Sequence, residues 1–426
     1  MNMKAVVRET GLKAHTIRAW ERRYGLPQPT RSSGGHRVYS QRDVEAIKWL
    51  VARREQGMQI HRAVELWRNL EAQGKDPLFE EPYAISPPLI AGSELQILRE
   101  HWVEACRVFD ERKAEQILIR AFGLFPPETV CLDLILEGLA KIGEAWYAGE
   151  FTVQQEHFAS ELTVRRLEIL IASTPPPSLP DRILVICAPG ENHTISALML
   201  TFLLRRRGCD ALFMGANVPI DRFQEALSAN KPRLVIATAQ QLVTAASLLD
   251  MAHFMKQHPI PLAFGGRIFN EVPQVRDSIP AFFMSENLNQ IYTLVEDLLA
   301  TSPPTPEAKA LDVSYSQALQ HFIQRQPQVE ASVVEDPSLG AIALDHLTLA
   351  NDHLSSNIRA ALSLGNLAFL GNELEWIKGL LAHHGIQVEQ LDSYLKAYTR
   401  ALSRQLDVQG QLIVDYLSDL IEGDQA

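Results

Sequence analysis

The stretch that decides the fold of the central part of the chain runs from Arg182 to Ser196 and reads RILVICAPGENHTIS. Six apolar residues follow Arg182 before a Pro-Gly pair ends the run. A short run that is apolar on both faces predicts a buried strand of a parallel sheet. The polar loop that follows, with Glu191 and His193, would then lie at the carboxyl edge of that sheet, where ligands bind in open α/β folds.

Four more segments of the same kind follow, with helical patterns between them. They span residues 209–214, 233–238, 260–264 and 281–284. Strands that alternate with helices predict successive parallel units covered on both faces. We therefore expect residues 181–300 to form a Rossmann-like domain with a five-stranded parallel, flavodoxin-like sheet.

The loop after the first strand resembles a known cofactor motif. Its pattern Glu191-x-His193-x2-Ser196 is similar to the Asp/Glu-x-His-x2-Gly signature of cobalamin-binding Rossmann-like domains. The resemblance implies that His193 is the lower axial ligand of cobalt, and it is the metal-ligand candidate. The chemistry agrees, because imidazole is a good cobalt ligand and a neighbouring carboxylate fixes its tautomer and raises its basicity.

The same family motif continues with a Ser or Thr site and, beyond it, a Gly-Gly pair that together admit the nucleotide tail of the cofactor. Thr238 stands 42 residues after Ser196, and Gly265 and Gly266 follow the fourth predicted strand. Two positions depart from the pattern: Ser196 replaces the usual glycine, and Gln240 stands where the family has a smaller or apolar residue. The cofactor that the resemblance implies is adenosylcobalamin or methylcobalamin.

Residues 93–172 place apolar side chains at helical spacing, which predicts a four-helix bundle. Within it, a Trp is followed after nine residues by Glu-His, as in the helical domain that caps cobalamin in cobalamin-dependent MerR photoreceptors. This resemblance implies that the upper face of the cofactor is covered by Trp146, Val153, Glu156 and His157.

The photoreceptors of that family carry a second histidine directly after the Trp, and here the position holds Tyr147. A phenol, with a pKa near 10, is a poorer cobalt ligand than imidazole. Cobalamin binding is therefore better supported than the light mechanism of the family. A different upper ligand, a different light response and a cobalamin sensor that does not use light all stay open.

Residues 1–72 read as short helices followed by a turn-rich hairpin. Residues 14–24 are compatible with a helix that stops at Gly25, and a Gly-Gly turn then separates two short extended arms. The capping box from Ser40 to Asp43 starts the next helix. The implied order is helix, turn, helix and wing.

The run from residue 16 to residue 39 resembles the DNA-binding domain of the mercury-resistance-regulator (MerR) family. The resemblance implies a winged helix-turn-helix whose helix lies in the major groove and whose wing grips the backbone. The candidate DNA-contacting residues are Thr16, Arg18, Trp20, Arg22, Arg23, Tyr24, Arg31, His36, Arg37 and Tyr39.

The charge of the chain is unevenly distributed. The 426 residues carry a formal net charge of −11, but residues 1–70 hold 14 Lys and Arg against six Asp and Glu, a net charge of +8, which leaves −19 for the remainder. A basic segment on an acidic chain indicates a domain that meets a polyanion. The chain average alone would have argued against nucleic acid.

Pro-rich joints divide the chain into modules, and no module contains a long apolar run. The joints lie at residues 74–88, 173–180 and 301–306, and the last of them leaves residues 307–426 as a fourth, helical module of unknown role. No apolar run is long enough to cross a bilayer, and the four cysteines form no CxxC pair. We expect a cytoplasmic protein with no membrane association.

These features predict a regulator rather than an enzyme. The leading hypothesis is a transcriptional regulator that binds palindromic double-stranded DNA as a homo-oligomer, a dimer or tetramer, and whose oligomeric state and DNA affinity are set by bound cobalamin. A regulator of the same fold that senses another ligand or a partner protein is the alternative. A cobalamin-dependent methyltransferase or mutase subunit is less favoured, because no segment reads as a catalytic barrel. The basic N-terminal domain, residues 1–72, which we call the head, would also have no role in such an enzyme.

Overall fold

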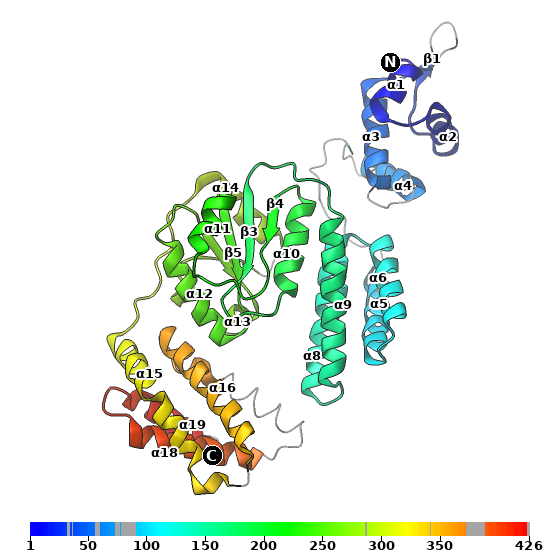
Figure 1. Ribbon diagram of the computed structural model, residues 1–426. Coiled ribbons are helices and arrows are strands. Elements are labelled where there is room, and N and C mark those ends of the chain that lie inside the picture. The colour runs from blue at the N-terminus through cyan, green and yellow to red at the C-terminus, as the bar shows by residue number, and fades with distance from the viewer. Residues whose placement is uncertain are drawn as a thin grey trace. The chain divides into compact units, whose positions relative to one another are not determined.

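The computed structural model describes residues 1–31, 35, 37–55, 60–72, 77, 91–285, 288–340, 342–371 and 388–423 (Figure 1). The chain forms two compact units. The first comprises Met1–Ala105 with Asp110–Gly138, and the second comprises Cys106–Phe109 with Leu139–Ala426.

The head contains the predicted helices and wing. Its elements are α1 (Met3–Thr10), α2 (Ala14–Tyr24), β1 (Thr30–Arg31), β2 (Arg37–Val38), α3 (Gln41–Glu55) and α4 (Ile60–Ala72). Helix α2 ends at Gly25, whose φ of 65° is in the left-handed region that favours glycine. The capping box is confirmed, since Asp43 N–H donates to Ser40 Oγ at 3.1 Å and Ser40 N–H donates to Asp43 Oδ2 at 2.8 Å. The antiparallel pairing of β1 with β2 confirms the wing.

The region predicted as a helix bundle is helical throughout. It contains α5 (Ala91–Arg107), α6 (Glu111–Leu124), α7 (Pro127–Thr129), the π-helix η1 (Val130–Leu136), α8 (Glu137–Tyr147) and α9 (Val153–Ala172). A full capping box at Thr152 starts α9: Thr152 Oγ1 accepts from Gln155 N–H, and Gln155 Oε1 accepts from Thr152 N–H. The loop between α8 and α9 is therefore fixed where the Glu-His pair begins.

The second unit contains the predicted sheet. Strands β3 (Arg182–Cys187), β4 (Asp210–Phe213), β5 (Leu234–Thr238), β6 (Leu262–Gly265) and β7 (Phe282–Phe283) are parallel and lie in the order β4-β3-β5-β6-β7. They alternate with α10 (Ile195–Arg206), α11 (Phe223–Asn230), α12 (Leu242–Met255), α13 (Arg267–Glu271), η2 (Pro273–Ser278) and α14 (Leu288–Thr301). Five of the six residues of β3 and all of β5 are buried, as runs apolar on both faces predict. The five-stranded parallel sheet is thus confirmed.

The last module is helical, as predicted, and it packs against the sheet domain. Its elements are α15 (Val313–Val334), η3 (Pro337–Leu339), α16 (Leu344–Ser363), α18 (Val388–Gln405) and α19 (Gln411–Gly423). Helix α16 lies against α12, and buried side chains of both belong to one hydrophobic cluster. Ser278 Oγ also donates to Leu364 O at 2.7 Å. The sheet domain and the last module therefore share a core.

None of the helices in the described part of the chain is both long and apolar enough to span a membrane.

Candidate functional site

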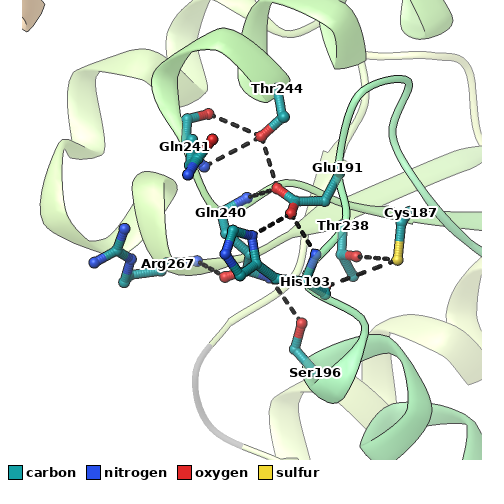
Figure 2. A network of polar contacts seen from close by, with 9 residues as sticks. All are labelled: Cys187, Glu191, His193, Ser196, Thr238, Gln240, Gln241, Thr244 and Arg267. Carbon is teal, nitrogen blue, oxygen red and sulfur yellow. Dashed lines mark hydrogen bonds and ion pairs between the residues drawn. The ribbon is translucent and has the colours of Figure 1, made fainter. Parts of the chain in front are cut away.

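The site forms where two neighbouring strands end. Cys187 at the end of β3 is paired with Thr238 at the end of β5, so the loops that leave these strands begin side by side. Ala188 N–H donates to Thr238 O at 2.9 Å and extends the pairing by one residue. The β3–α10 loop carries Glu191 and His193, and the β5–α12 connection carries Gln240. Figure 2 shows how these loops meet.

Glu191 is the buried centre of the site. It has no exposed surface, and its two carboxylate oxygens accept four hydrogen bonds (Figure 2). Oε1 accepts from the backbone N–H of His193 at 2.8 Å and lies 2.6 Å from His193 Nδ1. Oε2 accepts from Gln240 N–H at 2.6 Å and from Thr244 Oγ1 at 2.8 Å. One carboxylate therefore holds both loops and the start of α12.

The electrostatics of the pair favour an ionised carboxylate beside a basic imidazole. Burial by itself raises the pKa of Glu191, but the hydrogen bonds from His193, Gln240 and Thr244 outweigh it, and the pKa lies below its usual value. The bond to Glu191 raises the pKa of His193, while burial and the charge of Arg267 act in the opposite direction. Glu191 also fixes the proton of the neutral imidazole on Nδ1.

His193 consequently presents its second nitrogen away from Glu191. No described residue makes a hydrogen bond to Nε2, and 62% of the His193 side chain is exposed. An imidazole held by a carboxylate at Nδ1, with a lone pair on an accessible Nε2, is the arrangement that metal-ligating histidines use. The residues present therefore fit the lower axial position of a cobalt corrinoid.

Ser196 and Gln240 are brought together across the site. Gln240 Nε2 donates to Ser196 Oγ at 2.7 Å, and Gln240 Oε1 accepts from Arg267 N–H at 2.9 Å. From the sequence Gln240 was noted only as a departure from the motif, and Thr244 was missed. The signal for Thr244 is the capping box that it forms with Gln241 at the start of α12.

The other motif residues lie at the same edge of the sheet. Thr238 is 5% exposed, and its hydroxyl donates to Cys187 Sγ at 3.7 Å. Gly266 has a φ of 132°, and a Cβ there would lie 1.9 Å from Ala239 O. Gly266 thus lets the loop after β6 approach the end of β5 more closely than any other residue could.

The helical residues predicted for the upper face lie around the α8–α9 turn. Trp146 and Tyr147 end α8 and are half-buried, whereas Val153 and His157, in the first turns of α9, are exposed. Glu156 Oε1 accepts from Ser160 Oγ at 2.7 Å, and the charge of Glu156 contributes to the raised pKa of His193. The charge of Glu156 thus connects one of the predicted capping residues to His193 on the β3–α10 loop.

The head presents part of the predicted DNA-binding set. Arg18, Arg22 and Arg23 are exposed on α2, and Thr16 and Tyr24 are half-buried. Arg31 lies in β1, and His36 lies outside the described residues. The exposed arginines give α2 a cationic surface.

Two predicted DNA contacts need correction. Trp20 is 6% exposed and Tyr39 is 1% exposed, and both belong to the core of the head. Trp20 lies three residues after Ile17, on the inward face of α2, and Tyr39 follows the wing directly. Their side chains hold the head together and do not present a DNA-contacting surface.

Arg37, another predicted DNA contact, connects the wing to α2. Its Nε lies 2.8 Å from Glu21 Oε2 and 3.1 Å from Oε1, with both side chains partly exposed. The hydrogen bond to Glu21 is the largest influence that raises the pKa of Arg37. Glu21, which the sequence did not single out, thus fixes the wing against the arginine-bearing helix.

Two family models and several known proteins are similar to this chain. Residues 1–70 match the MerR HTH family regulatory protein model, and residues 98–171 match the B12 binding domain model. The chain is 30% identical to the HTH-type transcriptional repressor CarA of Myxococcus xanthus over 276 residues, which are 62% of this chain and 86% of that protein. It is 29% identical to the HTH-type transcriptional repressor CarH of the same organism over 225 residues, 53% of this chain and 74% of that protein. Among solved structures, the monomethylamine corrinoid protein of Methanosarcina barkeri is similar with a TM-score of 0.40 and 17% identity, covering 48% of this chain and 99% of that one.

Proposed function

Because the chain belongs to the family of MerR-type transcriptional regulators that carry a cobalamin-binding domain, we propose that cobalamin held at His193 controls how this regulator binds DNA. The observation that carries the proposal is the 2.6 Å contact between Glu191 Oε1 and His193 Nδ1. It leaves Nε2 as the ligating atom, at the edge of the sheet where α/β folds bind ligands.

The residues at the sheet edge would hold the lower side of the cofactor. His193 would supply the lower ligand of cobalt, and Ser196, Thr238, Gly265 and Gly266, at or near the ends of β5 and β6 and the start of α10, would admit the nucleotide tail. Trp146, Val153, Glu156 and His157 cover the upper face, where adenosylcobalamin or methylcobalamin carries its organic group. The cofactor would supply an upper ligand that can be exchanged. The chain would supply the sheet edge below the cofactor and the α8–α9 turn above it, which respond to the exchange.

The head would bind double-stranded DNA. Arg18, Arg22 and Arg23 on α2 enter the major groove, Thr16 and Tyr24 flank them, and Arg31 and His36 on the wing reach the backbone. Arg37 keeps the wing in place through Glu21. One small head contacts few phosphates, so tight binding needs paired heads on a palindromic operator and hence a dimer or tetramer.

Regulation then requires that the cofactor state change the surface between copies. A ligand shifts an assembly only if it binds the two states with different affinity. Exchange of the upper ligand beside Trp146 and Glu156 would alter the surface of the α8–α9 turn, and with it the oligomer that pairs the heads.

A second candidate function is a regulator of the same fold that senses another ligand. The observation in its favour is the hydrogen bond between Gln240 and Ser196, because it spans the position through which the nucleotide tail of cobalamin would enter.

Absorbance titration of the purified full chain with adenosylcobalamin separates the two candidates. We expect the parent protein to shift the cofactor to the spectrum of a base-off, histidine-ligated form, and His193→Ala to abolish the shift. His346→Ala changes an exposed histidine on α16 and is the matched control, which should leave the shift intact. An unchanged cofactor spectrum in the parent protein would contradict the proposal and favour the second candidate.

A further inference from the structure

The Gln240 side chain forms a bridge at the carboxyl edge of the sheet, where the chain leaves β3 and β5. From β3 the chain passes to β4 on one side and then to β5 on the other. In open α/β sheets the crevice opens at such a switch point, between the loops that leave the two strands. Ser196 follows β3 and Gln240 follows β5, so the 2.7 Å bond between Gln240 Nε2 and Ser196 Oγ closes the crevice at this point (Figure 2).

The same amide also reaches the third loop of the site. Gln240 Oε1 accepts from Arg267 N–H at 2.9 Å, directly after the Gly-Gly pair. One side chain therefore links the loop after β5 to the first turn of α10 and to the start of α13. Both of its bonds are made between neutral groups, and the side chains of Gln240 and Ser196 are only half-buried.

The backbone of Gln240 is held separately from its side chain. Its N–H donates to the buried Oε2 of Glu191 at 2.6 Å, a bond to an ionised acceptor. Neutral hydrogen bonds at a half-exposed position are weaker than this and exchange with water or with a ligand. The side chain can therefore leave the crevice while Glu191 keeps His193 in position.

We propose that the Gln240 side chain is a latch across the crevice, which opens to admit the tail of a corrinoid and selects for a tail that carries hydrogen-bonding groups. The proposal rests on the function proposed above. A ligand that enters breaks both amide bonds, and it must satisfy Ser196 Oγ and Arg267 N–H in their place, because a polar group that the bound ligand shields from water and leaves unpaired is costly. The nucleotide tail of cobalamin carries phosphate and ribose oxygens that can do so.

Two corrinoids test this directly, since cobalamin has the nucleotide tail and cobinamide lacks it. Stopped-flow absorbance would give the association rate of each with the full chain. We expect Gln240→Leu, which removes the amide group and cannot bridge, to accelerate cobalamin association about tenfold, because two neutral hydrogen bonds no longer hold the closed state. Cobinamide association should stay unchanged. Gln224→Leu, on the exposed face of α11, is the matched control and should change neither rate.

Ser196→Ala removes the bond between Gln240 and Ser196 by deleting its acceptor. It provides a second test of the latch in case the Gln240 variant fails to fold. It should accelerate cobalamin association by a smaller factor, about threefold, because the bond to Arg267 remains. The double variant should be no faster than Gln240→Leu alone, since both changes act through one contact.

Each other outcome is decisive. Parent rates in both variants, or equal acceleration of cobalamin and cobinamide, would overturn the latch while leaving cobalamin binding at His193 intact. Corrinoid binding by Gln240→Leu but not by the parent protein would mean that the Gln240 side chain blocks the site without opening, and would overturn the latch together with the proposed function. Binding of neither corrinoid by the parent or by either variant would overturn the proposed function together with the latch.

Discussion

At the residue scale, the geometry of the site depends on Glu191, because its two carboxylate oxygens serve different partners. Oε1 orients His193, whereas Oε2 ties down Gln240 and Thr244. Its lowered pKa keeps it ionised, so its stabilising contribution is present above the unfolded pKa of about 4.3 and is lost as pH falls through the lower folded value. The histidine behaves in the opposite way: with a raised pKa, the stabilisation from its protonated form is present below about 6.5 and is lost as pH rises through the folded value.

Glu191→Gln tests this coupling through the pH dependence of cobalamin binding. Cobalt needs the unprotonated Nε2, so binding to the parent protein should weaken as pH falls through the raised pKa of His193. The amide removes the charge that raises this pKa, and we expect the midpoint of the binding curve to move to lower pH. The free energy of unfolding at neutral pH should fall by about 2 kcal/mol, since hydrogen bonds to a charged group are lost. Titration across pH and urea denaturation measure both effects, and an unshifted midpoint would mean that Glu191 does not control the imidazole.

At the element scale, the sequence predicted the strands and their polar loops because both leave local signatures. Runs apolar on both faces gave β3 and β5, and the motif after β3 gave Glu191 and His193. The bridge from Gln240 to Ser196 could not be predicted, because it depends on how close the loops after two strands come in space.

Trp20 and Tyr39 were misassigned for a different reason. The family pattern has an aromatic residue at both positions, but an aromatic residue can belong to such a pattern because it fills the core. The burial of Trp20 and Tyr39 indicates that they do so here. Glu21 was overlooked because its partner, Arg37, is 16 residues away and comes near only when the wing folds back. The module boundaries at 72, 93, 172, 181, 300 and 307 stay a prediction.

The arginines of α2 give a prediction about phosphate contact. Arg22→Ala removes one exposed cation, so we expect weaker binding to all DNA sequences and a decrease of about one in the slope of log affinity against log salt. The control is Arg222→Ala, which removes an exposed arginine just before α11 and should leave the slope unchanged. Fluorescence anisotropy at several salt concentrations measures both variants. If Arg22→Ala keeps the parent slope, α2 does not lie along the phosphates.

At the scale of the whole molecule, charge and packing assign different roles to different parts of the chain. The head carries +8 within residues 1–70, and the remaining −19 disfavours DNA contact outside it. The last module, which the sequence left without a role, shares a hydrophobic cluster with the sheet domain through α12 and α16. Thr244, which donates to Glu191, lies on α12, so the helix that packs against the last module begins beside Glu191.

Tyr147 determines what we expect of light as a signal for the oligomeric state of the chain. A phenol is a poorer cobalt ligand than imidazole, so when an upper organic group is lost this position offers no imidazole to take its place. We expect the adenosylcobalamin-loaded chain to elute identically in the dark and after illumination, and Tyr147→His to make its elution light-dependent. Size-exclusion chromatography of both proteins, with the cofactor-free forms as controls, measures this. A light-dependent shift in the parent protein would show that another side chain accepts the cobalt, and Glu156→Gln and His157→Ala would then identify whether the α9 turn provides it.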